Sequence, residues 1–481
     1  MILLAVLLPI AVGILLPLAR LENRRLKLAA IVITLAASAG ACLVLALDGD
    51  KVFRILKMTD RLSLDLMTDD LSRLFIILTS GGWLLTGIYA CVYMKHEQNE
   101  DRFFAFMLIS EGVMLTVCLS ANLTTLYTAY VLLTLVSMPM VIHSMSKESV
   151  QAARKYLFYS IGGAFLALLG MFFIYKYTET SDFVLGGTLL TADAMANRKL
   201  LLTMLFLAIL GFSSKAAIYP LHGWLPAAYT IPAPASALLS GLIAKSGVIA
   251  VIRVIYYNVG ADFLRGTREQ IALIVLSLLT VFMGSMMAYQ EKVLKRRMAW
   301  STVSQLSYIL VGLFIMSPMG LQGALLHTVF HMLSKICLYM AAGAIIFLTG
   351  KTSVDELGSI GKQLPKTMVC FTLASLTLIG IPPTGGFTSK WYLASAALEG
   401  MDGVLGWLIP VVLLISALLT AGYLLPIAVA AFFPDRDGTV PKRINEPTMM
   451  WVPMLILAVL AVVLGLFSGG IVEFTGKIAG I

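Results

Sequence analysis

The chain has 481 residues, of which 59% are hydrophobic and only 13% charged, and its formal net charge is +9 at pH 7. Soluble domains carry about 25% charged residues, and so few polar groups could not cover a soluble surface of this size. The composition predicts a polytopic membrane protein and excludes a secreted disulfide scaffold, a nucleic-acid-binding protein and a soluble enzyme.

A helix that crosses the hydrocarbon core needs about 20 apolar residues. The sequence predicts an all-α membrane protein with about 14 such helices. The expected spans are 2–19, 28–47, 70–94, 103–120, 122–142, 155–176, 200–220, 231–257, 270–290, 299–317, 321–349, 366–400, 404–433 and 449–471. The first span has no basic segment before it and no clear cleavage site, so we expect a retained helix and not a signal peptide.

Two of these spans contain clusters of helix-breaking residues, at 219–226 (YPLHGWLP) and at 380–386 (GIPPTGG). Proline and glycine free backbone polar groups, which membrane proteins tolerate only where the backbone faces protein or a wet cavity. The two clusters lie about 160 residues apart along the chain. This spacing is typical of paired broken-helix repeats in ion transporters.

The distribution of lysine and arginine predicts the orientation of the chain in the membrane. If the N-terminus lies outside, the inside loops contain nineteen of the thirty-five cations and the outside segments ten. Cytoplasmic loops are enriched in these residues. The sequence therefore predicts a multi-pass protein of the cell (inner) membrane with both termini outside.

Six cations fall within the expected spans. Arg73 and Arg253 lie near span ends, where we expect them to reach water by snorkelling. The other four lie in mid-span or beside a helix break, where a charge costs at least a few kcal/mol, and all are lysines: Lys215, Lys245, Lys335 and Lys390. Such residues indicate function.

Two histidines extend this polar set. His327, His331 and Lys335 follow one another at intervals of four residues, so they share one helix face, and Gln305 lies in the preceding span. Lysines and histidines at hydrogen-bond or one-water spacing can relay protons. The histidine pair could instead bind zinc, although no third ligand is near in the sequence, or could serve as structural hydrogen-bonding groups between helices.

Only one acidic residue, Glu111, falls inside an expected span. Asp69 and Asp70 precede the third span and are expected to cap its helix. The five cysteines are far apart and lie in apolar stretches, which excludes a conventional iron–sulfur ligand set in this chain. There is also no dinucleotide-binding glycine fingerprint. We therefore expect no cofactor here.

Several segments, taken together, resemble the antiporter-like membrane subunits of respiratory complex I, membrane-bound hydrogenases, formate hydrogenlyases and Mrp-type sodium/proton antiporters. They are LGFSSKAAIYPLHGWLPAA at 210–228, APASALLSGLIAKSG at 233–247, KRRMAWSTVS at 295–304, the His327/His331/Lys335 spacing and GIPPTGGFTSKW at 380–391. The resemblance implies fourteen helices with two inverted five-helix repeats, helices 4–8 and 9–13, and breaks in helices 7 and 12. The corresponding expected units are 1–100, 101–258, 259–433 and 434–481.

The resemblance also implies roles for individual residues. Lys215 and Lys245 match the lysines of the family's helices 7 and 8, and Lys390 matches its terminal helix-12 group. His327 and His331 match the polar pair of helix 11.

Two positions depart from the family pattern. Val131 stands where relatives have the helix-5 glutamate that pairs with the helix-7 lysine, and Gln305 stands where many have a histidine. Because Glu111 is the only intramembrane acid available, we expect it to replace that glutamate as the ion-pair partner of Lys215.

These observations predict an ion-translocating subunit, most simply for protons, in a multi-subunit membrane oxidoreductase. Electron transfer would then belong to partner chains, and the expected partners are other membrane subunits and the lipid bilayer, with no nucleic acid. Whether the chain takes part in an enzyme reaction is left open by the absence of a redox centre. Two alternatives remain: a subunit of an Mrp-type sodium/proton antiporter without redox partners, and a scaffold subunit that no longer conducts.

Overall fold

The computed structural model describes residues 1–19, 22–59, 62–433 and 442–481, with the side chain of Tyr229 left out. Three cations that enter the predicted loop distribution, Arg20, Arg61 and Arg436, lie outside the described residues. The predicted 434–481 unit likewise begins in a segment that is not described.

The first half of the chain runs from the N-terminus to Val259. Its helices are α1 (Ile2–Leu18), α2 (Arg24–Leu47), α3 (Asp70–Tyr93), η1 (Met94–His96), α4 (Glu100–Cys118), α5 (Leu123–Val141), α6 (Lys147–Tyr177), α7 (Thr191–Ala196), α8 (Arg198–Ser213), α9 (Trp224–Ala227), η2 (Ala228–Thr230), α10 (Ala233–Leu238), η3 (Leu239–Ile243), α11 (Lys245–Ile252) and η4 (Arg253–Val259).

The second half continues as a further set of mostly long helices. They are α12 (Ala261–Leu264), α13 (Arg268–Gln290), α14 (Leu294–Phe314), α15 (Pro318–Thr349), η5 (Val354–Glu356), α16 (Ile360–Gln363), α17 (Pro365–Ile379), α18 (Gly385–Gly400), α19 (Val404–Phe432), α20 (Thr448–Leu466) and α21 (Gly469–Ala479).

Among the described residues, nine helical segments are long and apolar enough to cross a membrane. Two shorter apolar helices, α1 and α17, accompany them. The predicted class, a mainly helical polytopic membrane protein, is confirmed. The count of fourteen spans, the inverted repeats and the four expected units stay predictions.

One short β-hairpin, which the sequence did not predict, accompanies the helices. Strand β1 (Lys51–Lys57) pairs antiparallel with β2 (Ser63–Thr68) in the segment between α2 and α3. Every residue of β1 is exposed, whereas Asp65, Leu66 and Thr68 of β2 are buried against the bundle. Because β1 has no buried face, burial does not impose an alternating pattern on it, and the hairpin is hard to predict from the sequence.

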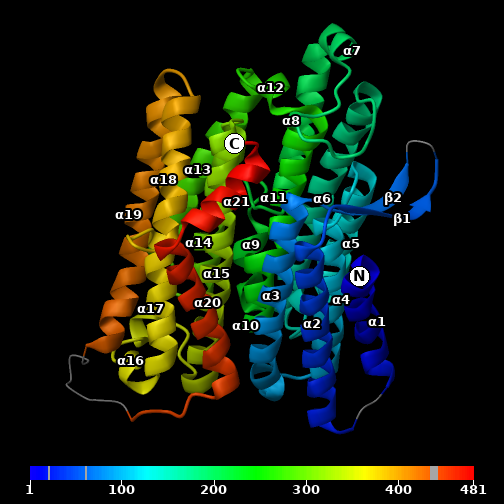
Figure 1. Ribbon diagram of the computed structural model, residues 1–481. Helices are drawn as coiled ribbons and strands as arrows, with labels where there is room; N and C mark the ends of the chain where they lie inside the picture. The colour runs from blue at the N-terminus through cyan, green and yellow to red at the C-terminus, as the bar shows by residue number, and fades with distance from the viewer. Residues whose placement is uncertain (20–21, 60–61, 434–441) are drawn as a thin grey trace.

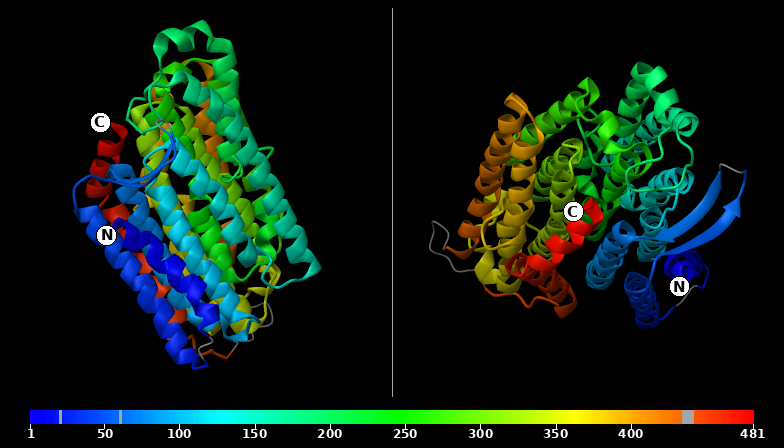
Figure 2. Two further views of the ribbon diagram at one scale, coloured as in Figure 1. Left: turned by 90° about the vertical axis from the view of Figure 1, so that its right-hand side faces the viewer. Right: turned by 45° about the horizontal axis from the view of Figure 1, so that its top comes forward.

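The connections gather at the two ends of the helix bundle (Figures 1 and 2). The hairpin, α7 and α12 lie toward one end, and α16 lies at the other (Figure 1). Loops that the sequence assigns to the same side of the membrane therefore lie at the same end.

Both predicted breaks coincide with the ends of helices. Helix α8 ends at Ser213 and α9 begins at Trp224, while α17 ends at Ile379 and α18 begins at Gly385. Gly380 caps α17 at φ +88°, a left-handed conformation that favours glycine. A Cβ atom on Gly386 would lie 1.7 Å from the carbonyl oxygen of Thr377, so only glycine permits this close return of the chain.

The helix that contains Lys245 has an irregularity that the sequence did not predict. Two π-helical segments, η3 and η4, lie on either side of α11. The π-helix is rare and is frequently found at functional sites. All residues from Ala233 to Val259 are buried, which places this element at the centre of the bundle.

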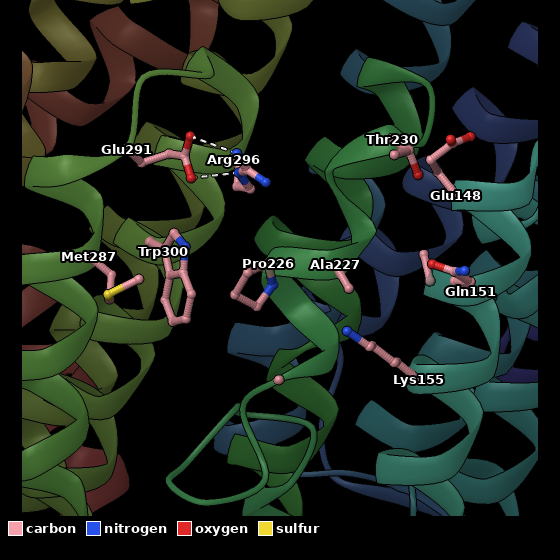
Figure 3. Close-up of a pocket in the computed structure, with 12 residues that line it drawn as sticks. Glu148, Gln151, Lys155, Pro226, Ala227, Thr230, Met287, Glu291, Arg296 and Trp300 are labelled. Atoms are coloured by element: carbon pink, nitrogen blue, oxygen red, sulfur yellow. Dashed lines mark hydrogen bonds and ion pairs between the residues drawn. The ribbon is translucent and has the colours of Figure 1, made fainter.

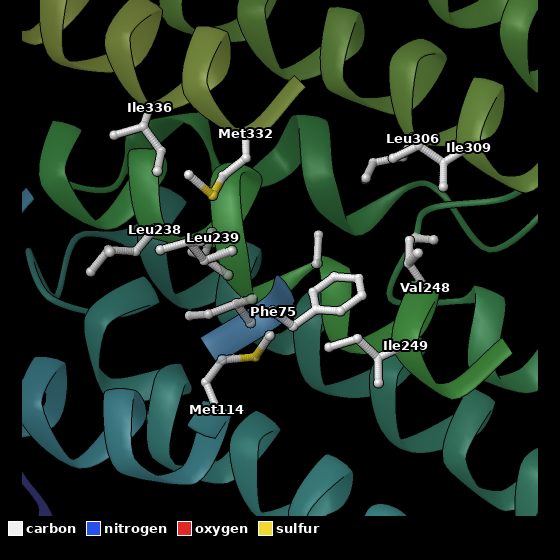
Figure 4. Close-up of a cluster of buried hydrophobic side chains, with 14 of the residues drawn as sticks. Phe75, Met114, Leu238, Leu239, Val248, Ile249, Leu306, Ile309, Met332 and Ile336 are labelled. Atoms are coloured by element: carbon white, nitrogen blue, oxygen red, sulfur yellow. The ribbon is translucent and has the colours of Figure 1, made fainter. Parts of the chain in front are cut away.

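Apolar side chains surround this central element (Figure 4). The cluster includes Phe75 of α3, Met114 of α4, Ile249 of α11, Leu306 of α14 and Met332 of α15, all of them buried. Close packing of apolar side chains excludes water and lowers the local dielectric constant. Polar groups embedded here interact strongly with one another.

The prediction that Arg253 snorkels to water is wrong. Its side chain is 1% exposed and forms a two-pronged bond with Asp69, at 2.6 and 2.8 Å. Asp69 is the N-cap of α3 and forms a capping box with Ser72, which confirms the predicted cap. A carboxylate across the bundle, and not the solvent, therefore compensates the charge of Arg253.

Candidate functional site

Lys215 lies just beyond the end of α8, at the first helix break, and is 1% exposed. Its ammonium nitrogen donates to the carbonyl oxygen of Tyr130 at 2.5 Å and lies 3.9 Å from the centroid of the Tyr130 ring. The Tyr130 hydroxyl donates to the carbonyl of Phe212, at 3.2 Å, in the last turn of α8. One tyrosine of α5 thus holds both the lysine and the helix end that carries it.

Helix α11 packs directly against this lysine. A Cβ atom on Gly247 would lie 3.2 Å from Cβ of Lys215 and 2.7 Å from the carbonyl oxygen of Phe212. Because glycine has no side chain, the two backbones can approach this closely. Lys245, two residues earlier, begins the same helix.

Lys245 is 2% exposed and binds two groups. Its ammonium nitrogen donates to the carbonyl of Ser240, at 2.7 Å, and lies 2.7 Å from Nδ1 of His331. Ser240 belongs to the π-helical segment η3, whereas His331 belongs to α15. This contact is a direct side-chain link between the two halves of the chain.

His327 continues the polar line one turn along α15. The rings of His327 and His331 have centroids 6.2 Å apart, and His327 stacks on Tyr308 at 5.3 Å. Nδ1 of His327 lies 3.0 Å from the hydroxyl of Ser389. Ser389 immediately precedes Lys390 in α18.

Lys390 lies beside the second helix break. Its ammonium nitrogen donates to the last carbonyls of α17, those of Leu378 at 2.9 Å and Ile379 at 2.7 Å. It also lies 5.2 Å from the centroid of the Tyr308 ring. A helix C-terminus carries partial negative charge, so the end of α17 is a favourable position for a cationic side chain.

Lys335 has a hydrogen-bond partner outside the line of residues from Lys245 to Lys390. It is fully buried, and its ammonium nitrogen donates to the carbonyl of Met298 in α14 at 3.0 Å. Among the described residues, no hydrogen bond joins Lys335 to His331 or His327. The predicted shared face is present, but the hydrogen bond of Lys335 goes to α14 and not to either histidine.

Glu111 does not meet the expectation that it pairs with Lys215. The structure describes both residues and contains no direct ion pair between them. Glu111 is fully buried and faces Ser38 and Cys42 of α2, and neither of its carboxyl oxygens has a hydrogen-bond partner among the described residues. Sequence spacing placed Glu111 on the correct helix but could not show which neighbour its side chain faces.

Several other buried polar atoms along this line have no partner among the described residues. They include Nε2 of both histidines, both amide atoms of Gln305 and the hydroxyl groups of Ser307 and Ser334. Buried polar groups without a protein partner are usual sites for ordered water. The region between α14 and α15 therefore has the polar groups that a water-linked chain needs.

A cavity of about 500 Å³ lies beside the first helix break (Figure 3). We call it the vestibule. It lies between α6, the α9 segment and the α13–α14 turn; its lining includes Glu148, Gln151, Lys155, Pro226, Ala227, Glu291, Arg296 and Trp300.

Charged side chains line the vestibule, and tryptophan residues connect it to the first helix break. Partial burial alone would raise the pKa of Glu291, but the bond from Arg296 at 2.5 Å outweighs it and holds that pKa below its ordinary value. The ring of Trp300 lies 5.9 Å from that of His222 within the break. The indole of Trp224 donates to the carbonyl of Ser214, at 3.0 Å, immediately before Lys215.

The zinc alternative finds no support in this geometry. In the part of the chain that the structure describes, no group of three histidine, cysteine, aspartate or glutamate side chains lies close enough to hold a metal ion. Nδ1 of His331 is already engaged by Lys245.

Sequence reasoning missed three residues that complete the arrangement. Tyr130 and Tyr308 lie in apolar spans, where an aromatic residue ordinarily indicates packing, and Ser389 gives no signal of its own. The one available clue was the proximity of Ser389 to Lys390 in the sequence.

A buried lysine at the first helix break and a partly buried lysine at the second, linked through a central histidine pair, are typical of an antiporter-like membrane subunit. Residues 120–420 match the family model described as "NADH:quinone oxidoreductase/Mrp antiporter, TM". The chain is 32% identical over 425 residues to the NADH-quinone oxidoreductase subunit N of Desulforudis audaxviator. The aligned region covers 85% of this chain and 83% of that protein. The chain belongs to this family.

Solved structures show the same fold. A chain of the Mrp complex from Dietzia sp. superposes with a TM-score of 0.86 at 23% identity, covering 100% of this chain and 97% of that one. A chain of the membrane-bound sulfane sulfur reductase, an archaeal respiratory membrane complex, superposes with a TM-score of 0.88 at 21% identity and the same coverage.

Proposed function

We propose that this chain is a proton-translocating subunit of a multi-subunit membrane oxidoreductase, and that it couples redox chemistry in partner subunits to ion movement. The observation that carries the proposal is the direct contact between Lys245 and His331, at 2.7 Å. It lies between the two lysines at the helix breaks, Lys215, which is buried, and Lys390, which is partly buried. Ionisable residues inside a membrane are costly, and they usually mark proton relays.

The proposed path begins at the vestibule. Water there reaches the first helix break, where the backbone is open and Lys215 lies buried. A proton accepted by Lys215 passes to Lys245 on the adjacent helix, by way of the close approach at Gly247. A buried lysine is costly to protonate. A second positive charge nearby adds repulsion, so protonation of one lysine makes protonation of the next more costly.

From Lys245 the proton crosses to the second half of the chain. His331 accepts it through Nδ1, and His327 and Ser389 carry it onward to Lys390. Histidine suits this step because either ring nitrogen can accept or release a proton. Lys335 is proposed as a charged neighbour that biases the histidine pair, since its hydrogen bond leads elsewhere.

The proposal includes the partners and the orientation. The sequence has neither a dinucleotide-binding glycine fingerprint nor a cysteine set for an iron–sulfur cluster, so the electron carriers are proposed to belong to other membrane-bound subunits. Both termini are proposed to lie outside, which places the vestibule on the inside. Two of the cation-rich segments, 147–155 and 292–297, contribute residues to the lining of the vestibule, which supports this orientation.

Reconstitution of the intact complex in vesicles tests the proposal. Substrate oxidation should acidify or alkalinise the vesicle lumen in the wild type, and Lys215→Ala should abolish the pH change while the complex remains assembled. Ion movement without any redox partner in the purified complex would instead support the Mrp-type alternative. A wild-type complex that oxidises substrate without moving ions would support the scaffold alternative.

A further inference from the structure

A second charged cavity lies far from the relay, at the beginning of α17 and α20. Its volume is about 280 Å³, and it is lined by Lys366, Arg443, Ile444, Asn445 and Glu446. Most of its lining comes from the residues just before α20. The backbone N–H of Ile444 donates to the carbonyl of Gln363, the last residue of α16, at 3.0 Å and holds these residues against that helix. We call it the basic pocket.

The single acidic residue of the basic pocket is already engaged. The Glu446 carboxylate accepts from the backbone N–H groups of Lys366 and Thr367, at 2.9 and 2.7 Å, and from the Thr367 hydroxyl at 2.6 Å. It therefore caps the N-terminus of α17. Its charge is taken up by the helix end and does not neutralise the two cations around it.

The two cations of the basic pocket have no counter-ion among the residues that the structure describes. Neither Lys366 nor Arg443 forms an ion pair with any residue that the structure describes, and both are exposed. Lys366 lies 4.2 Å from the centroid of the Trp451 ring, which holds its ammonium group at the mouth of the pocket. The indole Nε1 of Trp451 is buried without a hydrogen-bond partner among the described residues, so the ring beside Lys366 also carries an unused donor.

Apolar surface continues from the pocket along the two helices. Val369 of α17 is 44% exposed, and Met449 and Ile456 of α20 are 42% and 40% exposed. A tryptophan and a lysine at the start of a membrane helix are typical of the level of the lipid headgroups. Positive charge thus lies at headgroup depth, directly above an apolar surface that runs toward the membrane interior.

We propose that the basic pocket binds the phosphate headgroup of an anionic phospholipid whose acyl chains lie along the exposed faces of α17 and α20. Arginine and lysine recognise phosphate oxygens through charge-assisted hydrogen bonds, and basic pockets between membrane helices bind anionic headgroups. This proposal does not depend on the relay.

Native mass spectrometry of the full-length chain in a neutral detergent tests it, with phosphatidylglycerol and phosphatidylcholine of identical acyl chains as probes. The wild type should retain phosphatidylglycerol in preference to phosphatidylcholine. Lys366→Gln combined with Arg443→Gln should weaken phosphatidylglycerol binding about tenfold or more. Lys366→Arg combined with Arg443→Lys keeps both charges and should retain binding.

A matched control removes two other exposed cations at the same end of the bundle. Lys95→Gln combined with Lys147→Gln should leave phosphatidylglycerol binding unchanged. An equal loss in this control would show attraction by the general surface charge and overturn the proposal. Displacement of the lipid by millimolar inorganic phosphate would also overturn it, because it would show a site for a soluble anion without a contribution from the acyl chains.

Discussion

The ammonium nitrogen of Lys215 lies 2.5 Å from the carbonyl oxygen of Tyr130 and 3.9 Å from the centroid of its ring. A dipole and a π-face therefore contact this buried cation, and no carboxylate lies in direct ion-pair contact with it among the described residues. A tyrosine carbonyl and ring stabilise an ammonium ion less than a carboxylate does. This arrangement leaves Lys215 free to lose its proton, as a relay group must.

We expect the ring of Tyr130, and not its hydroxyl group, to matter for Lys215. Tyr130→Phe keeps the ring and the carbonyl and loses only the bonds of the hydroxyl to Phe212 and Ser214, so proton translocation should remain near the wild-type rate. Tyr130→Leu removes the cation–π contact and should slow translocation about threefold to tenfold. The measurement is the initial rate of the pH change in vesicles at equal amounts of assembled complex; equal rates for both variants would contradict the role of the ring.

His331 should be indispensable to transfer between the two halves of the chain. His331→Ala removes the acceptor of the contact with Lys245 and should lower coupled turnover about a hundredfold, the usual scale for loss of a proton-transfer group. His96→Ala is the control, because His96 is exposed at the end of η1, outside the membrane span. Small and equal effects of both substitutions would favour a purely structural role for the histidine pair.

Glu111→Gln tests whether Glu111 pairs with Lys215, as the sequence predicted, or faces α2 without a cation, as in the structure. If Glu111 faces α2 without a cation, the neutral isostere should leave both proton translocation and thermal stability close to wild type. An uncompensated buried charge costs several kcal/mol. Because Glu111 has no ion-pair partner among the described residues, its replacement removes no favourable ion pair. A loss of translocation comparable to that of Lys215→Ala would instead show that the two residues act together.

The pair of Arg253 and Asp69 should stabilise the fold. Arg253→Met leaves Asp69 without its counter-ion and should lower the free energy of unfolding by about 3–5 kcal/mol. Arg268→Met, at an exposed position at the start of α13, is the matched control and should change it little. Denaturant unfolding of the purified chain measures both, and an equal effect of the two would contradict a specific contribution of the pair.

The same pair predicts a pH dependence. Burial alone would raise the pKa of Asp69, but the Arg253 guanidinium outweighs it and holds that pKa below its ordinary value. A depressed pKa contributes stability above the unfolded value, and this contribution is lost as the pH falls through the folded value. Stability of the wild type should therefore decline in acid more steeply than that of Asp69→Asn, measured by unfolding between neutral and acidic pH.

Much of the site was predictable because its signals are local. A lysine inside an apolar run is unusual wherever it faces, and the proline and glycine clusters at 219–226 and 380–386 end helices through their own backbone restrictions. Intervals of four residues placed His327 and His331 on one face. These features depend on the chain only over a few turns, and the structure places them as expected.

Features that depend on contacts between distant segments were not predictable. The direction in which Glu111 faces depends on how α4 rotates against α2, and helical spacing alone does not determine that rotation. Arg253 was expected to reach water because its partner, Asp69, is 184 residues away. The π-helical segments beside Lys245 and the hairpin β1–β2 also depend on packing that composition does not reveal.

The most direct test of a relay through Lys215 is whether a complex with Lys215→Ala still translocates protons. The intact complex, reconstituted in sealed vesicles with a pH-sensitive dye, would be supplied with its electron donor and acceptor, with assembly confirmed by subunit composition. The relay predicts that the variant assembles but produces no pH change attributable to this subunit, whereas Lys155→Ala, at the wall of the vestibule, only slows it. A wild-type pH change in the Lys215→Ala complex would contradict the account.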